Sequence, residues 1–215
     1  MKSTIAFLLG FVMAAFAAAA IAQTPQPPEI AARQYYVIDL ASNQVLAERD
    51  ADVQADPASL TKLMTAYLVF NAVRDKKLTL QQQMTVSKRA WDERKGGGSL
   101  MFIDTLMTPT VAELLRGLIV QSGNDAAIAL AEGVSGTVEL FVAQMNRQAA
   151  AWGLKNTQFK NVAGLSEAGH YSSARDVATV AAHIVNDHPD FYPLYSMRQY
   201  TFNNIKQDNR NMLLG

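Results

Sequence analysis

A serine and a lysine stand three residues apart in Ser59-Leu60-Thr61-Lys62. Residues with this spacing lie on one face of a helix, so the hydroxyl and the amine can hydrogen-bond. A serine beside a base is a potential nucleophile, but the amine must be neutral to accept its proton. The lysine pKa would have to fall by roughly three units from ~10.4, or ~4 kcal/mol, which requires a semi-buried cleft. The alternative is an exposed, inert pair, because such a short pattern also arises by chance.

A second group of polar residues occurs in Ser122-Gly123-Asn124, between two segments with helical periodicity. A turn at this place can project the serine hydroxyl and the asparagine amide into a cleft. The residues also suit a structural function, because Ser122 could cap the next helix with Asp125 completing a capping box. Taken alone, the tripeptide favours capping over catalysis, although one turn can serve both purposes.

The elements that must position these residues begin with a β-hairpin. Two β-prone runs, at residues 35–40 and 44–48, flank a short group of turn-forming residues. A helix is expected from Pro57 to about Val73, with Asp56 as its cap and the proline in its first position. Ser59 would lie in the first turn of that helix, where free backbone N–H groups favour negative charge.

The middle of the chain has the periodicity of a helical block. Further helices are expected near residues 125–132, 138–151 and 174–185. Thr110 and Glu113 are spaced as a capping box for another helix. The triple glycine at 96–98 predicts a loop whose backbone approaches a neighbour or a ligand, with a plain flexible connection as the alternative. A strand at 200–202 and a turn at 209–211 complete the order, which predicts an α+β domain with an antiparallel sheet packed against the helices.

Composition and missing motifs exclude several kinds of function. With 49% hydrophobic and 18% charged residues, the 215-residue chain is typical of one globular domain. Its formal net charge of zero lacks the basic footprint of a nucleic-acid partner. No cysteine is present, so thiol catalysis and disulfides are excluded. No G-x-S-x-G elbow or H-E-x-x-H motif occurs, and His183 and His188 are expected to be solvated near a helix end rather than metal ligands.

The N-terminus has the pattern of an exported protein. Residues 1–22 combine Lys2, an apolar run and the terminal Ala20-Ile21-Ala22, which together predict a cleaved signal peptide. Residues 23–31 follow as a proline-rich extended spacer. A retained membrane helix is the alternative, since the apolar run is just long enough to span a bilayer.

Together, the two polar groups resemble the Ser-x-x-Lys and Ser-x-Asn motifs of penicillin-binding proteins and serine β-lactamases. The chain looks most like the low-molecular-mass D-alanyl-D-alanine carboxypeptidases from about Tyr36 to its last residue, and the fold implied is their transpeptidase fold. Five blocks carry the resemblance in one order: residues 56–62, 98–102, 121–126, 153–157 and 171–176. Residues 32–215 would then be a D,D-carboxypeptidase catalytic domain.

The resemblance implies a function for each motif residue. Ser59 would be the acylated nucleophile and Lys62 its general base. Ser122 would relay a proton toward the leaving group, while Asn124 would hold the substrate backbone or orient the lysine. The implied partners are a peptidoglycan stem peptide, which loses its terminal D-alanine, and β-lactams, which are trapped on the serine. No metal, organic cofactor or nucleic acid is implied.

The chain also departs from the family pattern. It contains no Lys-Thr-Gly tripeptide, the third family motif, and stops at Gly215 shortly before the expected strand, so we expect the C-terminal strands to be missing. Loss of one oxyanion donor typically costs ~100- to 1000-fold in rate, so this piece alone should be feeble. Leu106 stands where the family usually has a turn glycine, and Val162-Ala163 stands where the family usually has other residues. A β-lactamase, a D,D-endopeptidase and a non-catalytic peptidoglycan-binding relative remain alternatives, as does peripheral membrane attachment through a further C-terminal segment.

Overall fold

A computed structural model describes residues 28–214, and the chain from Ala32 onward forms one compact unit. The predicted signal peptide at 1–22 lies outside the described residues, as does the spacer up to residue 27. The elements are β1 (Tyr35–Asp39), β2 (Gln44–Arg49), η1 (Ala58–Leu60), α2 (Thr61–Arg74), α3 (Lys88–Asp92), η2 (Glu93–Lys95), α4 (Val111–Val120), α5 (Asn124–Ser135), α6 (Val138–Ala151), α7 (Ala174–Asp187), η3 (Tyr192–Ser196), β3 (Gln199–Phe202), β4 (Ile205–Asp208) and η4 (Met212–Leu214).

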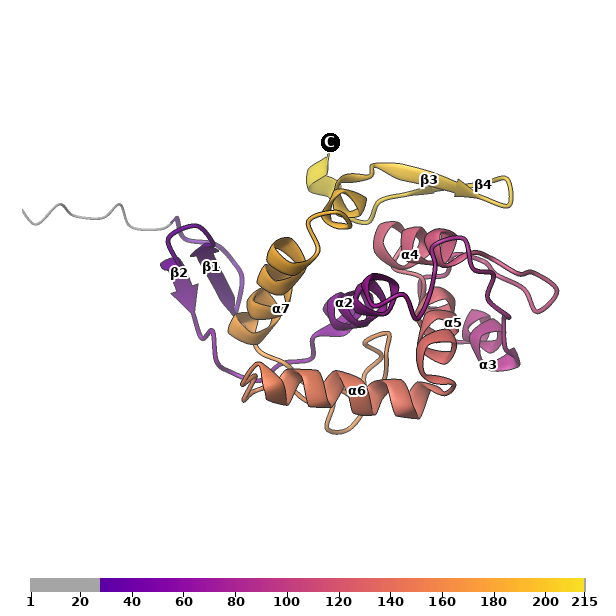
Figure 1. Ribbon diagram of the computed structural model, residues 1–215. Coiled ribbons are helices and arrows are strands. Elements are labelled where there is room, and N and C mark those ends of the chain that lie inside the picture. Colours follow the sequence, from indigo (N-terminus) through magenta and orange to yellow (C-terminus); the bar gives the residue numbers. More distant parts are fainter. Residues whose placement is uncertain (1–27, 215) are drawn as a thin grey trace, which may run out of the picture. The chain divides into compact units, whose positions relative to one another are not determined.

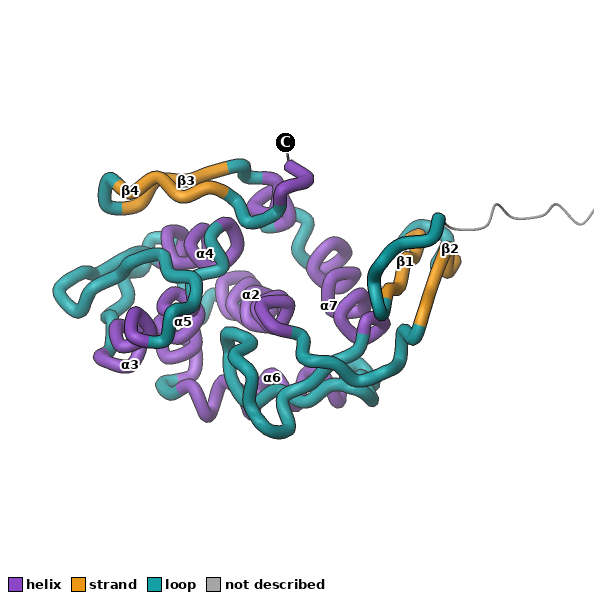
Figure 2. Tube along the Cα trace, turned by 180° about the vertical axis from the view of Figure 1, so that it is seen from behind, coloured by secondary structure: helices purple, strands orange, loops and turns teal. Residues whose placement is uncertain are grey.

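Helix α2 lies at the centre of the helical block (Figure 1). It packs against α4, α5, α6 and α7, and the reverse view shows the same enclosure (Figure 2). Its buried side chains include Met64, Val69 and Phe70. Each such side chain contributes roughly 1.5–3 kcal/mol when it is removed from water, so the helix is held firmly. Lys62, near its N-terminal end, therefore lies in a largely apolar environment.

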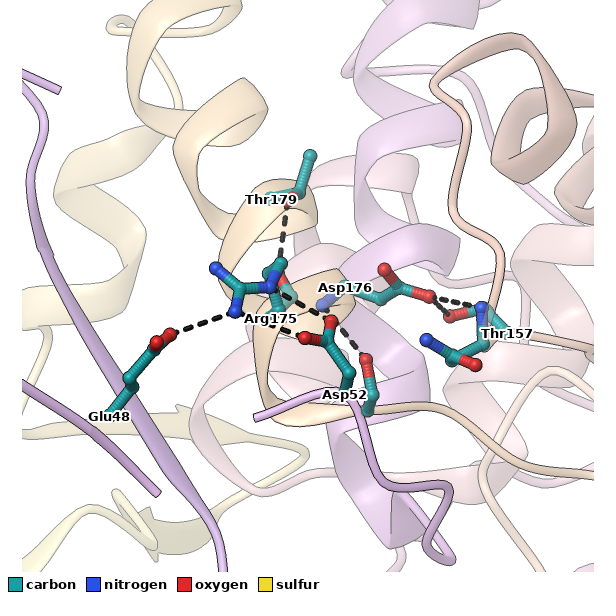
Figure 3. A network of polar contacts seen from close by, with 8 residues as sticks. Glu48, Asp52, Thr157, Arg175, Asp176 and Thr179 are labelled. Carbon is teal, nitrogen blue, oxygen red and sulfur yellow. Dashed lines mark hydrogen bonds and ion pairs between the residues drawn. The ribbon is translucent and has the colours of Figure 1, made fainter. Parts of the chain in front are cut away.

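The N-terminal hairpin is tied to α7 by a cluster of charges (Figure 3). Strands β1 and β2 pair antiparallel, as predicted, and β1 packs against α7. The Arg175 guanidinium, on α7, donates to Glu48 at 2.8 Å and to Asp52 at 2.8 and 3.0 Å. It also lies 4.5 Å above the centre of the Tyr36 ring. This bidentate, stacked arrangement fixes the hairpin more firmly than a single exposed ion pair would.

A second antiparallel hairpin follows the helices. Strand β3 confirms the strand predicted at 200–202, whereas β4 was not predicted because its sequence is mostly polar. Asn203 and Asn204 join the two strands with φ values of 47° and 62°, the conformation of a tight two-residue hairpin turn. The two hairpins form separate two-stranded sheets, and the α+β class is as predicted.

Capping residues explain where most helices begin. Thr110 and Glu113 form the predicted capping box at the start of α4. Thr137 and Ser173 accept hydrogen bonds from the first turns of α6 and α7. Helix α6 has the predicted bounds, and α5 and α7 differ from the predicted ranges by a few residues at their ends. Among residues 28–214, no single helix is long and apolar enough to cross a membrane, although the bent pair α5 and α6 has the required length and composition.

Of the two C-terminal histidines that were predicted to be solvated, His188 is buried and His183 is partly exposed. His188 is only 3% exposed, and its Nε2 lies 3.1 Å from Asn71 Oδ1. His183 is stacked on Trp152, with ring centroids 3.9 Å apart, and its Nδ1 lies 2.9 Å from Asp187 Oδ2. Both histidines are therefore part of the packing between α2, α6 and α7.

Candidate active site

The segment just before Ser59 is fixed by a bridge to a distant residue and by a local hydrogen bond. Ala55 forms an antiparallel bridge with Ser172, which has two backbone hydrogen bonds of 2.8 and 2.9 Å. Asp56 accepts a hydrogen bond from the Ala58 N–H at 2.9 Å. Ala58 itself has a φ of 45°, an uncommon conformation for a residue with a side chain. The backbone immediately before Ser59 is thus strained and firmly fixed, as is frequent at functional sites.

The helix predicted from Pro57 begins later than expected. Ser59 lies in the short 3-10 helix η1, and α2 starts only at Thr61. Asp56 does not cap α2, because the left-handed Ala58 interrupts the regular helical turn at this point. The spacing argument still gives the correct neighbours: Lys62 Nζ lies 3.2 Å from Ser59 Oγ.

Lys62 has three partners arranged around its amine. Besides the contact with Ser59, its Nζ donates to Asn124 Oδ1 at 2.8 Å and to the Ala163 carbonyl oxygen at 2.7 Å. A neutral amine has two N–H donors and one lone pair. When both donors are used by Asn124 and Ala163, the lone pair faces the Ser59 hydroxyl. This geometry prepares Lys62 to take the serine proton.

Burial brings Lys62 toward the neutral form. The residue is 5% exposed, and desolvation lowers its pKa from 10.5 to about 8, the largest influence on it. The negative charges of Glu93 and Asp125 raise the pKa, and the positive charge of Arg210 lowers it. About a tenth of the lysine is then neutral at pH 7, compared with well under a hundredth for an ordinary lysine.

The second polar group enters the same site from the turn between α4 and α5. Asn124 is the first residue of α5, and its backbone N–H donates to the Ser99 carbonyl oxygen at 2.8 Å. Ser122 has a φ of 63°, which turns the chain before the helix. Gly123 is the N-cap of α5 and no side chain caps the helix, so the capping prediction for Ser122 is wrong. Its Oγ is buried and has no hydrogen-bond partner among residues 28–214.

A pocket of about 110 Å³ joins the two groups. Ser59, Lys62 and Ser122 line it together with apolar side chains of α2 and α4. Tyr195, which no motif singled out, also lines this pocket. Its hydroxyl is buried without a partner in the described part of the chain, and burial raises its pKa, so it stays a protonated donor. Two residues that line the pocket next to Ser59 thus have buried hydroxyl groups without a hydrogen-bond partner in this part of the chain.

Asp125 anchors the loop beside this pocket. Its carboxylate accepts hydrogen bonds from the backbone N–H groups of three consecutive residues, Met101, Phe102 and Ile103, at 2.9 to 3.1 Å. Desolvation raises the pKa of Asp125, and these N–H donors lower it. The aspartate is therefore a structural support for the loop, and does not complete the capping box predicted with Ser122.

A glycine loop places the carbonyl group that binds Lys62. The Asn161 side-chain oxygen accepts hydrogen bonds from the N–H groups of Ala163, Gly164 and Leu165. Gly164 has a φ of 85°, and a Cβ atom there would lie 1.7 Å from the carbonyl oxygen of Ala58. The loop can thus approach the Ser59 segment only because this residue lacks a side chain.

The structure brings together all four residues selected from the sequence. Ser59, Lys62 and Asn124 are linked by direct contacts, and Ser122 lines the same pocket. The Ala163 carbonyl group could not be found from a motif, since any residue supplies a carbonyl oxygen. The arrangement contains a hydroxyl nucleophile, a base with a depressed pKa and a second hydroxyl group without a partner. These are the groups that acyl transfer requires.

Comparison with known proteins finds relatives over nearly the whole chain. The D-alanyl-D-alanine carboxypeptidase DacC of Escherichia coli is 44% identical over 212 residues, which are 97% of this chain and 52% of the relative. Penicillin binding protein 5 from Haemophilus influenzae has a solved structure with 45% identity and a TM-score of 0.86, covering 88% of this chain and 55% of that one. Penicillin binding protein 6B from Escherichia coli matches with 42% identity and a TM-score of 0.85 over 90% and 62% of the two chains.

These likenesses confirm the predicted penicillin-binding protein fold. The chain spans about half the length of the curated relatives that it matches. The family model described as D-alanyl-D-alanine carboxypeptidase matches residues 21–215. The chain belongs to the D-alanyl-D-alanine carboxypeptidase family.

Proposed function

We propose that the full-length protein is a serine-type D-alanyl-D-alanine carboxypeptidase that acts on peptidoglycan stem peptides and is acylated by penicillin. The observation that carries this proposal is the position of the Lys62 amine, which lies 3.2 Å from Ser59 Oγ while Asn124 Oδ1 and the Ala163 carbonyl oxygen accept from it. In the neutral form these two acceptors use both N–H donors, so the lone pair is available to the serine proton. Family membership supports the substrate, because the relatives are named for this reaction.

The reaction follows from the positions of the hydroxyl groups. Ser59 Oγ attacks the carbonyl carbon between the two D-alanines while Lys62 takes the serine proton. The tetrahedral intermediate then collapses, the C–N bond breaks, and a proton relayed through the Ser122 hydroxyl allows D-alanine to leave as a neutral amine. Water next attacks the ester, the Ser59–acyl bond breaks, and the shortened peptide leaves with the serine restored.

Penicillin would enter the same sequence but stop after its first half. The β-lactam C–N bond opens when Ser59 attacks, but the released nitrogen stays attached to the acyl group and cannot diffuse away. A long-lived adduct is therefore expected, whereas a β-lactamase would release the opened drug rapidly. A D,D-endopeptidase would instead cut cross-linked dimers. Whether so large a substrate can reach Ser59 depends on access to the pocket.

The discriminating experiment uses the full-length protein and three substrates. We expect release of D-alanine from a stem pentapeptide, little cleavage of a cross-linked dimer, and a penicillin adduct that persists for many turnover times in a mass spectrum. Rapid appearance of hydrolysed penicillin would support the β-lactamase alternative. Binding of peptidoglycan without D-alanine release or an adduct would support the non-catalytic alternative.

We also propose a periplasmic location. The predicted signal peptide at residues 1–22 supports export, and the proposed substrate lies outside the inner membrane. Peripheral attachment through a further C-terminal segment is part of this proposal. Cell fractionation with and without a high-salt wash would test it, and recovery of unprocessed protein from the cytoplasm would contradict it.

The rate of acylation should depend on pH through Lys62. Only the neutral amine accepts the serine proton, and the pKa is about 8, so the rate constant should rise about tenfold from pH 6 to pH 7 and level off above about pH 9. Stopped-flow measurement with a fluorescent penicillin checks this. A profile that is flat from pH 6, or that continues to rise beyond pH 10, would contradict the assignment of Lys62 as the base.

Substitution of Gly164 should damage the site through the backbone. The added Cβ atom in Gly164→Ala would overlap the Ala58 carbonyl group and displace the Ser59 segment, and a misplacement of about 1 Å can cost ~100-fold in rate. Gly136→Ala is the matched control, because Gly136 also has a positive φ, of 81°, but no atom within 4 Å of the added Cβ. Acylation of Gly164→Ala at the wild-type rate would show that the contact is unimportant.

A further inference from the structure

His170 is a buried histidine that the proposed reaction does not use. It is 6% exposed and follows Gly169, whose φ of 81° turns the chain at the end of the loop that supplies the Ala163 carbonyl group. Its backbone N–H donates to the Glu167 carbonyl oxygen at 2.9 Å, which closes this turn. Its imidazole Nε2 lies 2.9 Å from Thr61 Oγ1. The histidine is therefore hydrogen-bonded to the first residue of α2, which directly precedes the general base.

The two hydrogen bonds of the imidazole ring fix the position of its proton. The backbone N–H of Lys160 donates to His170 Nδ1 at 3.0 Å, so Nδ1 must carry a lone pair. In a neutral imidazole the other nitrogen then carries the proton, and Nε2–H donates to Thr61 Oγ1. A second proton would place an N–H group on Nδ1 against the Lys160 N–H, and two donors cannot form a hydrogen bond. Both contacts are therefore compatible with one neutral tautomer and not with the imidazolium ion.

The 161–170 loop is attached to α2 by its backbone as well as by the histidine ring. The Val162 carbonyl oxygen accepts from Thr65 Oγ1 at 2.8 Å. The Ala163 carbonyl oxygen accepts from Lys62 Nζ at 2.7 Å, and it is one of the two groups that occupy the N–H donors of the neutral amine. Loss of the histidine contact would weaken the attachment of the loop to α2. The carbonyl group that orients the lysine would then be held less firmly.

The charges around the ring and its burial have opposite effects on its protonation. Burial disfavours the imidazolium form and has the larger influence, so the pKa of His170 is lowered from its ordinary value of 6.5. The negative charges of Asp56 and Glu167 favour the imidazolium form. Two lysines belong to the segments packed against the ring: the Lys62 amine is directed to the active site, and Lys160 offers the ring its backbone N–H. The ring is therefore neutral at pH 7 and takes up a proton only in acidic solution.

We propose that His170 is a positioning residue that works in its neutral form, holding the 161–170 loop against the start of α2 so that the Ala163 carbonyl group stays on Lys62. Protonation breaks the contact with the Lys160 N–H, the loop loses support, and the base loses one of the groups that orient it. Acylation should then decline in acid more steeply than the titration of the lysine alone explains. The inference rests on the proposed function, since it concerns the same nucleophile and base.

Two replacements of His170 each keep one half of its hydrogen bonding, and neither titrates. His170→Asn places an amide oxygen near the position of Nδ1, where it can accept from the Lys160 N–H, but is too short to reach Thr61. His170→Gln extends an amide nitrogen toward Thr61 but has no acceptor at the position of Nδ1. His183→Gln is the control, because this histidine is stacked on Trp152 and contacts no residue of the candidate site. The acylation rate constant of each full-length protein is measured with a fluorescent penicillin between about pH 5 and about pH 8.

Titration of Lys62 alone lowers the rate constant about tenfold for each pH unit below its pKa of about 8. In the wild type and in His183→Gln we expect a further loss of about threefold or more between about pH 6 and about pH 5, as His170 takes up its proton. Both His170 variants should show only the slope of the lysine. At pH 7 their rate constants should lie about three- to tenfold below that of the wild type, because the loop is less firmly placed.

¹⁵N NMR of the imidazole tests the same inference in the wild-type protein without penicillin. We expect the tautomer protonated on Nε2 and a titration midpoint below the ordinary 6.5. A ring protonated on Nδ1, or one that titrates at the ordinary value, would overturn the proposal even if a His170 variant failed to fold. So would a wild-type rate profile with the slope of the lysine alone, or an extra acid loss that persists in both His170 variants. Absence of any adduct on the wild type would contradict the proposed function, while the NMR titration would still decide the state of His170.

Discussion

Ser59→Ala should abolish covalent labelling of the full-length protein by a fluorescent penicillin. The alanine has no hydroxyl group to form the ester, and neither the Ser122 nor the Tyr195 hydroxyl group in the same pocket has a base placed against it as Lys62 is against Ser59. We therefore expect the rates of labelling and of D-alanine release to fall by ~10⁴-fold or more. Gel fluorescence and intact-protein mass measure the two losses.

The variant should remain folded, which separates loss of chemistry from loss of structure. Ser59 contributes no buried side chain to the core, and its hydroxyl contacts only the lysine amine among the hydrogen bonds described. Ser42→Ala, in the turn of the N-terminal hairpin, is a matched control that should label normally. A stable penicillin adduct on Ser59→Ala would place the nucleophile elsewhere in the chain.

Lys62→Met should be nearly as damaging to the reaction. Methionine has a similar length and suits a buried position, but it cannot take a proton, and removal of a general base typically costs ~10²- to 10⁴-fold. The acylation rate should also lose its rise between pH 6 and pH 9. Lys77→Met is the control, because Lys77 is exposed and forms only a surface ion pair with Asp75.

The same variant should change how stability depends on pH. Because the folded pKa of Lys62 is depressed to about 8 from 10.5, the unfolded chain holds more protons between these values, and wild-type stability should rise with pH there. Keeping Lys62 buried in its charged form costs on the order of 3 kcal/mol below about pH 8, and this penalty disappears as the pH rises to about 10.5. Urea unfolding at pH 8 and pH 10.5 should show this rise in the wild type and a smaller rise in Lys62→Met. Equal rises in both proteins would mean that Lys62 is not desolvated.

Much of the fold could be predicted because its signals are local. The capping pair Thr110 and Glu113 marks the start of α4, and apolar periodicity gives the bounds of α6. The first hairpin follows from two β-prone runs around a turn. Such signals depend on neighbouring residues only, so tertiary contacts do not overrule them.

The errors occur where long-range contacts decide the backbone. Nothing in the sequence near Ala58 shows that it is left-handed, because this conformation depends on the distant Gly164 loop. Ser122 was assigned to a cap by spacing, yet its φ of 63° removes it from that position. His188 has polar neighbours in sequence but is buried against α2. Strand β4 could not be recognised because its sequence is mostly polar.

The candidate site also combines contacts that follow from local sequence with contacts that depend on the tertiary structure. Ser59 and Lys62 are neighbours because of their spacing along one helical turn, which a sequence reveals directly. Their contact with Asn124 joins residues 62 apart, and only the resemblance to a known family suggested it. The Ala163 carbonyl group carries no recognisable pattern, since its importance arises from position alone.

The enclosure of α2 by four other helices has a consequence for drug resistance. A bacterium that evolved this protein to escape penicillin could not reposition the nucleophile by altering α2, because almost every substitution there would disrupt the core. The tolerant positions are the exposed loop residues 94–97 and 165–167 on either side of the site. Resistance mutations selected in the laboratory should therefore gather at these positions and leave the central helix unchanged.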